Sequence, residues 1–141
     1  MTVLSAAELQ AIMVEAFPGN AVPTVEAVTD ESVLISHAVD AQHGRPGGTL
    51  SGPTMMMVAD TAAWMAILAQ IGPVLLSVTT SLHIDFLRKP ALSDIMARAR
   101  VLKLGRKLAV VDVELFSRGQ SELVAKAQVT YALPSSGPPT T

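Results

Sequence analysis

The spacing of apolar residues divides the chain into helical and extended segments. Residues 5–17, SAAELQAIMVEAF, form an amphipathic helical pattern, with Ser5 as a candidate N-cap and Glu8 three residues later. Residues 24–28 and 32–39 are short and rich in β-branched side chains, and a polar turn separates them. We therefore expect a short helix followed by a pair of strands, and then a loop over residues 40–48.

A long second helix is predicted from about Gly52 to Gln70. Pro53 suits its first turn, and a Gly-Pro pair follows its end. The segment is apolar on nearly every side, so other elements must cover it. It falls just short of a membrane span, and Asp60 lies near its middle, where a bilayer would penalise a carboxylate. We expect a helix buried inside the domain and no membrane partner.

From Val74 onward the alternation of side chains is that of strands. Four long segments show it, at residues 74–89, 94–104, 107–117 and 122–133. Turn-like residues at 104–106 and 118–120 indicate consecutive hairpins, so we expect a four-stranded meander. The whole pattern predicts one α+β domain over residues 1–134, with an antiparallel sheet of five to six strands curled around the central helix. Residues 135–141 are expected to be a flexible tail.

Composition narrows the class of protein. The chain has 141 residues, half of them hydrophobic, which fits one domain and suggests that an oligomer buries further surface. No cysteine is present, so disulfides, thiolate metal sites and cysteine nucleophiles are excluded. Three scattered histidines make a metal site a poor hypothesis, and we expect no cofactor. The first residues lack the basic region of a secretory signal, so a cytoplasmic location is expected.

Charge is distributed unevenly. The first 44 residues hold six acids and no base, whereas residues 88–107 hold seven of the ten bases and one acid, Asp94. This pattern indicates either a local anion site or a solvated outer face. A net charge of −2 and few aromatic residues argue against nucleic acid as a partner.

Three motifs in fixed order support a resemblance to a known family. They are GGTLSGPTMMMVADTAAWMAI (47–67), TTSLHIDFLRKP (79–90) and ARVLKLGRKLAVVDVEL (99–115). Residues 45–131 resemble the hotdog-fold acyl-CoA thioesterases of the phenylacetic-acid-pathway (PaaI-like) type, in the 4-hydroxybenzoyl-CoA thioesterase superfamily. In that family the helix opens with His-Gly-Gly, and an acid follows eight positions after the first glycine. Gly52 and Asp60 keep this spacing, while Ser51 replaces the histidine.

The resemblance implies a catalytic site shared by two subunits. Asp60 would be the general base on water or the direct nucleophile, and the Gly52 N–H of the other subunit would stabilise the oxyanion. Thr80 would supply the hydroxyl that helps to hold the water, and Arg45 stands where relatives have Asn or Gln against the thioester. A homodimer or homotetramer is implied, with a small, medium-chain or aryl acyl-CoA as substrate.

Further residues are candidates for binding the substrate. Ser51, Met56 and Trp64 lie on or beside the central helix. For the methionines we favour core packing over lining an acyl tunnel, and Trp64 could either cap the acyl pocket or fill the core. The phosphates of coenzyme A could meet a basic group made of Arg88, Lys89, Arg106 and Lys107.

The same residues also fit three rival hypotheses. From the residues alone, Asp60 could be one half of a structural ion pair. The chain could also be a non-catalytic ligand-binding hotdog module, because Ser51 and Arg45 depart from the family pattern. A hotdog hydratase or dehydratase is a third hypothesis, but no histidine has the spacing to Asp40 or Asp60 that it would need.

Overall fold

The computed structural model of the chain describes residues 2–19, 21–39, 44–45, 49–73, 76–90 and 93–134. The predicted loop at 40–48 contains one half of a short two-stranded ladder, β3 with β4. The predicted tail, residues 135–141, lies outside the described residues. In chain order the elements are α1 (Ala6–Ala16), β1 (Thr24–Val28), β2 (Val33–His37), β3 (Gly44–Arg45), β4 (Thr49–Leu50), α2 (Gly52–Ile71), β5 (Val78–Phe86), β6 (Ile95–Leu104), β7 (Leu108–Ser117) and β8 (Leu123–Ala132).

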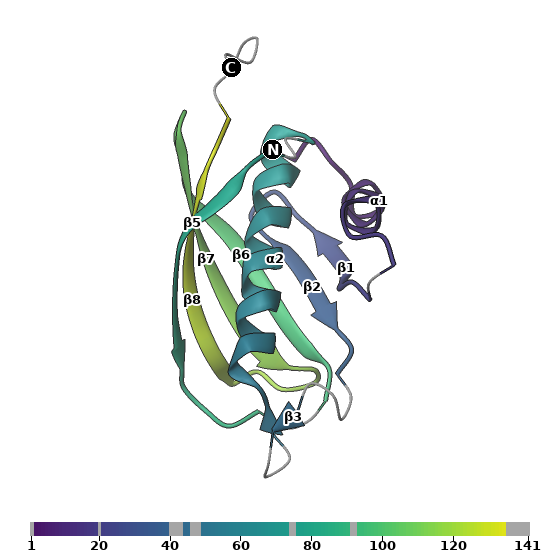
Figure 1. Cartoon of the computed structure of the whole chain (residues 1–141), viewed down its shortest axis with the longest axis vertical. Helices are drawn as coiled ribbons and strands as arrows, with labels where there is room; N and C mark the ends of the chain where they lie inside the picture. Colours follow the sequence, from purple (N-terminus) through teal and green to yellow (C-terminus); the bar gives the residue numbers. More distant parts are fainter. Residues whose placement is uncertain are drawn as a thin grey trace.

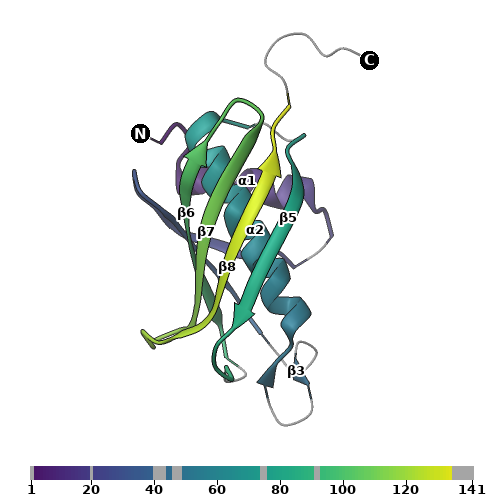
Figure 2. The ribbon, with the colours of Figure 1, turned by 90° about the vertical axis from the view of Figure 1, so that its left-hand side faces the viewer.

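A six-stranded antiparallel sheet curves around α2, and its strand order is β1-β2-β6-β7-β8-β5 (Figure 1). Figure 2 shows β6, β7, β8 and β5 side by side with α2 behind them. The short helix α1 lies beside β1, away from β5 (Figure 1). The predicted α+β class and hotdog fold are confirmed, and the sheet has six strands.

The expected four-stranded meander is wrong for its first strand. β6, β7 and β8 are joined by consecutive hairpins. β5, however, is an edge strand that pairs with β8 and is not paired with β6. The chain after β5 follows β8 first, because the N–H groups of Leu87 and Arg88 both donate to the carbonyl of Val124, at 2.9 and 3.2 Å. β8 and β7 lie between β5 and β6 in the sheet, so the connection from β5 to β6 is a crossover and not a tight hairpin.

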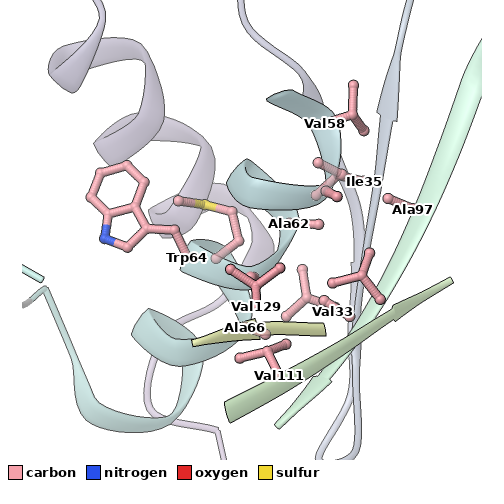
Figure 3. Packing of buried hydrophobic residues seen from close by; sticks show 14 of the residues in the cluster. Val33, Ile35, Val58, Ala62, Trp64, Ala66, Ala97, Val111 and Val129 are labelled. Carbon is pink, nitrogen blue, oxygen red and sulfur yellow. The ribbon is translucent and has the colours of Figure 1, made fainter. Parts of the chain in front are cut away.

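Small side chains let α2 lie close to the sheet. Five alanines of α2 are buried, and strands of the sheet contribute five more, so these core positions are filled by small side chains. Figure 3 shows Ala62, Ala66 and Ala97 among the larger buried side chains. By length and composition α2 could span a membrane, yet most of its side chains are buried against the sheet. The buried alanines are Ala59, Ala62, Ala63, Ala66 and Ala69 in α2, and Ala97, Ala99, Ala109, Ala125 and Ala127 in the sheet.

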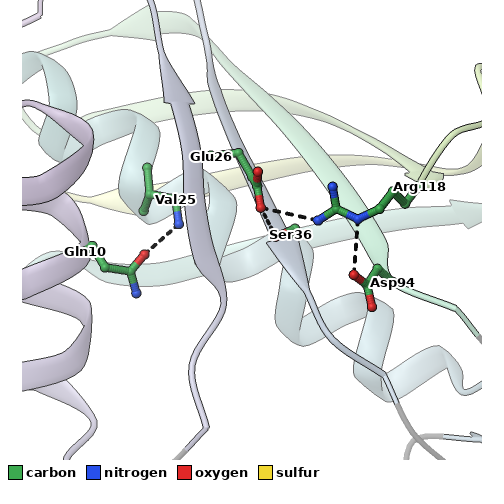
Figure 4. Close-up of polar contacts among 6 residues, drawn as sticks. All are labelled: Gln10, Val25, Glu26, Ser36, Asp94 and Arg118. Carbon is green, nitrogen blue, oxygen red and sulfur yellow. Dashed lines mark hydrogen bonds and ion pairs between the residues drawn. The ribbon is translucent and has the colours of Figure 1, made fainter.

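Side-chain hydrogen bonds hold α1 and the first two strands in place. Ser5 and Glu8 form the predicted capping box at the start of α1. Gln10 of α1 accepts a hydrogen bond from the Val25 N–H at 2.6 Å, so α1 covers the β1 edge of the sheet (Figure 4). Farther along β1, Glu26 accepts from Ser36 and pairs with Arg118, which also contacts Asp94 (Figure 4).

We predict that Ala62→Leu destabilises the fold by about 1–3 kcal/mol, because the added carbons must enter a packed helix–sheet contact. Urea unfolding at one fixed protein concentration measures the effect. Ala11→Leu on the exposed face of α1 is the matched control, expected within about 0.5 kcal/mol of the wild type. An Ala62→Leu variant as stable as the control would contradict the close packing described above.

Candidate active site

Asp60 lies in the first half of α2, half-buried, on the side that faces β5 and β8. The Thr79 hydroxyl donates to its Oδ1 at 2.7 Å, and the Tyr131 hydroxyl donates to the same oxygen at 2.9 Å. No basic side chain among the described residues forms an ion pair with it. Within that part of the chain, the hypothesis of a structural ion pair is not supported.

Tyr131 is the site residue that sequence reasoning missed. It is the only tyrosine of the chain, near the end of β8, and only 5% exposed. Its hydroxyl also lies 3.0 Å from the backbone oxygen of Asp60, so it joins β8 to α2. Burial raises the pKa of Tyr131 well above its usual range; a hydrogen bond with Thr79 opposes the rise, and the charge of Asp60 adds to it.

The strand hydroxyl beside Asp60 is that of Thr79, one residue before the expected Thr80. A β-bulge between Thr79 and Ser81 is the cause, since it inserts Thr80 as an extra residue and pairs Thr79 with Tyr131. Beyond the bulge, Leu82 faces inward, so regular alternation would have turned Thr80 inward as well. Thr80 instead donates to the backbone oxygen of Thr130 at 3.2 Å.

Gly52 begins α2, where the first N–H groups of a helix have no partner within the helix. Ser51 is the N-cap: its Oγ accepts from the Thr54 N–H at 3.3 Å and lies 2.8 Å from the Thr54 hydroxyl. The ring of Phe86, at the end of β5, lies 3.4 Å from where a Cβ on Gly52 would stand. Ser51 therefore caps the helix, and its predicted contact with substrate stays a prediction.

One chain does not bring Gly52 and Asp60 to the same point. Eight residues of helix separate them by about 12 Å along the axis. They also lie toward opposite ends of β5, because Gly52 neighbours Phe86 whereas Asp60 contacts Thr79.

The apolar candidates on α2 differ in exposure. Met56 and Met57 are 41% and 39% exposed and leave an open strip on α2 beside Asp60. Trp64 is buried and packs edge-on against Phe17, with ring centroids 6.1 Å apart. Its indole N–H has no hydrogen-bond partner among the described residues. Trp64 thus fills the space between α1 and α2.

The four basic candidates do not form one group within a chain. Arg88 and Lys89 follow the Phe86 end of β5, which pairs with Ala125. Arg106 and Lys107 lie at the opposite end of the sheet, just before Leu108, which pairs with Ala132. Arg88 is also engaged locally, with Glu122 at 3.1 Å and with the Leu123 carbonyl at 2.8 Å. The expectation of a single basic patch is corrected to two separate pairs.

Two remaining predictions concern Arg45 and metal ions. The backbone of Arg45 belongs to β3, and its side chain lies outside the part of the structure that is described. Among the described residues, no group of three or more potential ligands could hold a metal ion.

Comparisons with known proteins identify the class. Residues 47–124 match the sequence model of the thioesterase superfamily. A candidate thioesterase from Silicibacter sp. TM1040 is 39% identical, with a TM-score of 0.86 and coverage of 95% of this chain and 94% of that one. Zebrafish thioesterase superfamily member 2 is 26% identical, with a TM-score of 0.81 and coverage of 92% and 99%.

A third solved structure is a phenylacetic acid degradation-related candidate thioesterase from Ralstonia eutropha JMP134. It is 25% identical, with a TM-score of 0.72 and coverage of 79% of this chain and 84% of that one. The chain belongs to the thioesterase superfamily, and the class of enzyme thereby defined is a thioester hydrolase.

We predict that Tyr131 of the folded protein titrates well above pH 10, because its pKa is raised chiefly by burial. Since it is the only tyrosine, absorbance at the tyrosinate band reports on it alone, and the protein unfolded in urea supplies the reference, with a pKa of about 10. A raised pKa favours the neutral form in the folded state. The corresponding stability is complete below about pH 10 and is lost as pH rises further. Titration near pH 10 in the folded protein would contradict the buried contact with Asp60.

Proposed function

We propose that the protein hydrolyses acyl-CoA thioesters, with Asp60 acting on water and the Gly52 N–H of a second copy binding the oxyanion. The observation that carries this proposal is the Asp60 carboxylate itself. It is half-buried, two neutral hydroxyls orient it, and no cation among the described residues neutralises it. A positioned carboxylate without a cationic partner is a candidate general base.

An unpaired sheet edge supports the second copy. α1 covers the β1 edge through Gln10, whereas β5 is an edge strand without such cover among the described residues. Val78 and Phe86 of β5 are 59% and 49% exposed, and Met56 and Met57 of α2 are exposed beside them. A long edge strand with apolar side chains is a template for pairing, so we infer that β5 pairs with β5 of another copy.

Antiparallel pairing of the two β5 strands would complete the site. Thr79 and Phe86 are roughly 23 Å apart along the strand, at about 3.3 Å per residue. A two-fold axis near the middle of β5 would place Phe86 of one copy across from Thr79 of the other. The Gly52 helix terminus, which neighbours Phe86, would then approach Asp60, which contacts Thr79. Each dimer would hold two such sites.

The same pairing offers a place for the phosphates of coenzyme A. The Arg106–Lys107 turn of one copy would lie at the end of the sheet where the other copy carries Arg88 and Lys89. The two basic pairs, separate within a chain, would then flank the same end of the subunit groove. Guanidinium and ammonium groups at that end would attract phosphates.

The chemistry needs few groups. Asp60 takes a proton from a water molecule as the water oxygen attacks the thioester carbonyl, and the Gly52 N–H donates to the oxyanion that forms. Collapse of this intermediate breaks the C–S bond, and the coenzyme A thiolate takes up the proton that Asp60 accepted from water, which gives the thiol and the free acid and returns Asp60 to its ionised form. The alternative is direct attack by Asp60, which would form a mixed anhydride that water then hydrolyses.

We predict that Asp60→Asn abolishes release of coenzyme A while the fold is retained. Acetyl-, hexanoyl- and phenylacetyl-CoA serve as substrates, and the free thiol is measured for the wild type and the variant in parallel. The amide keeps the shape of the side chain but cannot accept the proton. Wild-type turnover on none of these esters, or an Asn variant as active as the wild type, would remove the proposal.

Mixed dimers test whether the site is shared. Gly52→Pro removes the N–H at a position where proline is tolerated, since Ser51 already has ψ 150° and the helix does not use that N–H. Alone it should lower kcat about 10²–10³-fold, and Gly52→Ala, which keeps the N–H, should lose less. Differently tagged Asp60→Asn and Gly52→Pro chains, expressed together, should regain about a quarter of the wild-type activity, because random pairing makes about half of the dimers mixed and each mixed dimer has one intact site out of two. Mixed dimers as inactive as either parent would place both groups in one chain's site.

A further inference from the structure

Tyr131 and Thr79 approach the same atom from two neighbouring strands. Their hydroxyls lie 2.9 and 2.7 Å from Oδ1 of Asp60. The two residues are direct partners across β8 and β5, because the bulge at Thr80 brings Thr79 into register with Tyr131. The other carboxylate oxygen, Oδ2, receives no hydrogen bond from the described residues.

We propose that Tyr131 and Thr79 are positioning residues that hold Oδ1 of Asp60 and leave Oδ2 as the oxygen that acts on water. This inference rests on the thioesterase function proposed above. A carboxylate oxygen has about two lone-pair sites, and two donors occupy those of Oδ1. Oδ2 keeps both of its own, so it is the oxygen able to accept the proton of the attacking water.

Neutral donors suit this task better than a cation would. A lysine or arginine at this point would stabilise the ionised carboxylate strongly and weaken it as a base. Two hydroxyls fix the plane of the carboxylate without placing a positive charge beside it. Tyr131 remains a protonated donor over the working range of pH, because burial raises its pKa.

The second contact of Tyr131 adds to the positioning. The same hydroxyl proton also faces the backbone oxygen of Asp60, at 3.0 Å, so it is shared between the side chain and the helical turn. A structural role alone would require only that the turn stay in place. A positioning role also requires that the loss of the hydroxyl change how the carboxylate titrates during catalysis.

The test compares Tyr131→Phe, Thr79→Val and Thr79→Ser with the wild type, using the most rapidly hydrolysed of acetyl-, hexanoyl- and phenylacetyl-CoA. Thr130→Val is the control, because Thr130 neighbours Tyr131 on β8 and pairs with Ser81 outside the bulge. Tyr131→Phe and Thr79→Val should each lower kcat by roughly tenfold with little change in KM, the effect of losing one hydrogen bond to a charged group. The acidic limb of the kcat/KM profile should move to higher pH in both variants. Thr79→Ser should restore both values, and Thr130→Val should match the wild type.

Two results would overturn the inference: an unchanged kcat in both hydroxyl-deleted variants, or a lowered kcat with an unshifted acidic limb. Should Tyr131→Phe fail to fold, Thr79→Val decides, since Thr79 is exposed and its replacement leaves the core intact. The outcome is separable from that of the proposed function. Activity that survives Asp60→Asn removes both proposals, whereas activity lost in Asp60→Asn but unaffected in the hydroxyl variants removes only this one.

Discussion

A carboxylate in the wall of an apolar helix must be supplied with hydrogen-bond donors, and the arrangement of the sheet around α2 meets that requirement at Asp60. The donors are hydroxyls from β5 and β8, so the two strands have to be neighbours at this point. The sheet meets this condition because β5 pairs with β8 and not with β6, the strand that follows it in sequence. The bulge at Thr80 then turns Thr79 toward the helix.

The two halves of α2 differ in packing and exposure. The alanine-rich contacts with the sheet fix its distance and direction, and α1 covers its second half at Trp64. The first half keeps Met56, Met57 and Asp60 accessible on one strip. The covered second half of α2 anchors the helix. The first half, which carries Asp60, is the part that a substrate or a second copy can reach.

The sequence was sufficient to predict the elements whose signals are local. One apolar segment with a proline at its start predicts both the span of α2 and its burial. Asp60 stands out in it as the one charged residue. The capping box of α1 and the hairpins of β6, β7 and β8 have equally local signatures. Each of these predictions agrees with the structure.

Non-local features could not be predicted in the same way. Tyr131 lies 71 positions from Asp60, so only the folded sheet shows that they meet. Thr80 was predicted in place of Thr79, its neighbour. The bulge between Thr79 and Ser81 reverses the alternation of side chains on which a strand prediction depends, and a run of hydroxyl residues gives no sequence signal for it. The basic residues were expected to form one group because they are close in sequence, yet β6 runs the length of the sheet between Lys89 and Arg106 and so places the two pairs at opposite ends.

The central claim is that the Asp60 of one copy and the Gly52 of another act on the same thioester carbonyl. It is tested most directly by a crystal structure of the wild-type protein with hexanoyl-dethia-CoA, in which a methylene replaces the sulfur so that the ketone cannot be hydrolysed. We predict that the ketone oxygen lies within hydrogen-bond distance of the Gly52 N–H of one copy, and that Asp60 Oδ2 of the second copy faces the carbonyl carbon through a water molecule. A ketone bound away from Asp60, or one that meets Gly52 and Asp60 of the same chain, would contradict it.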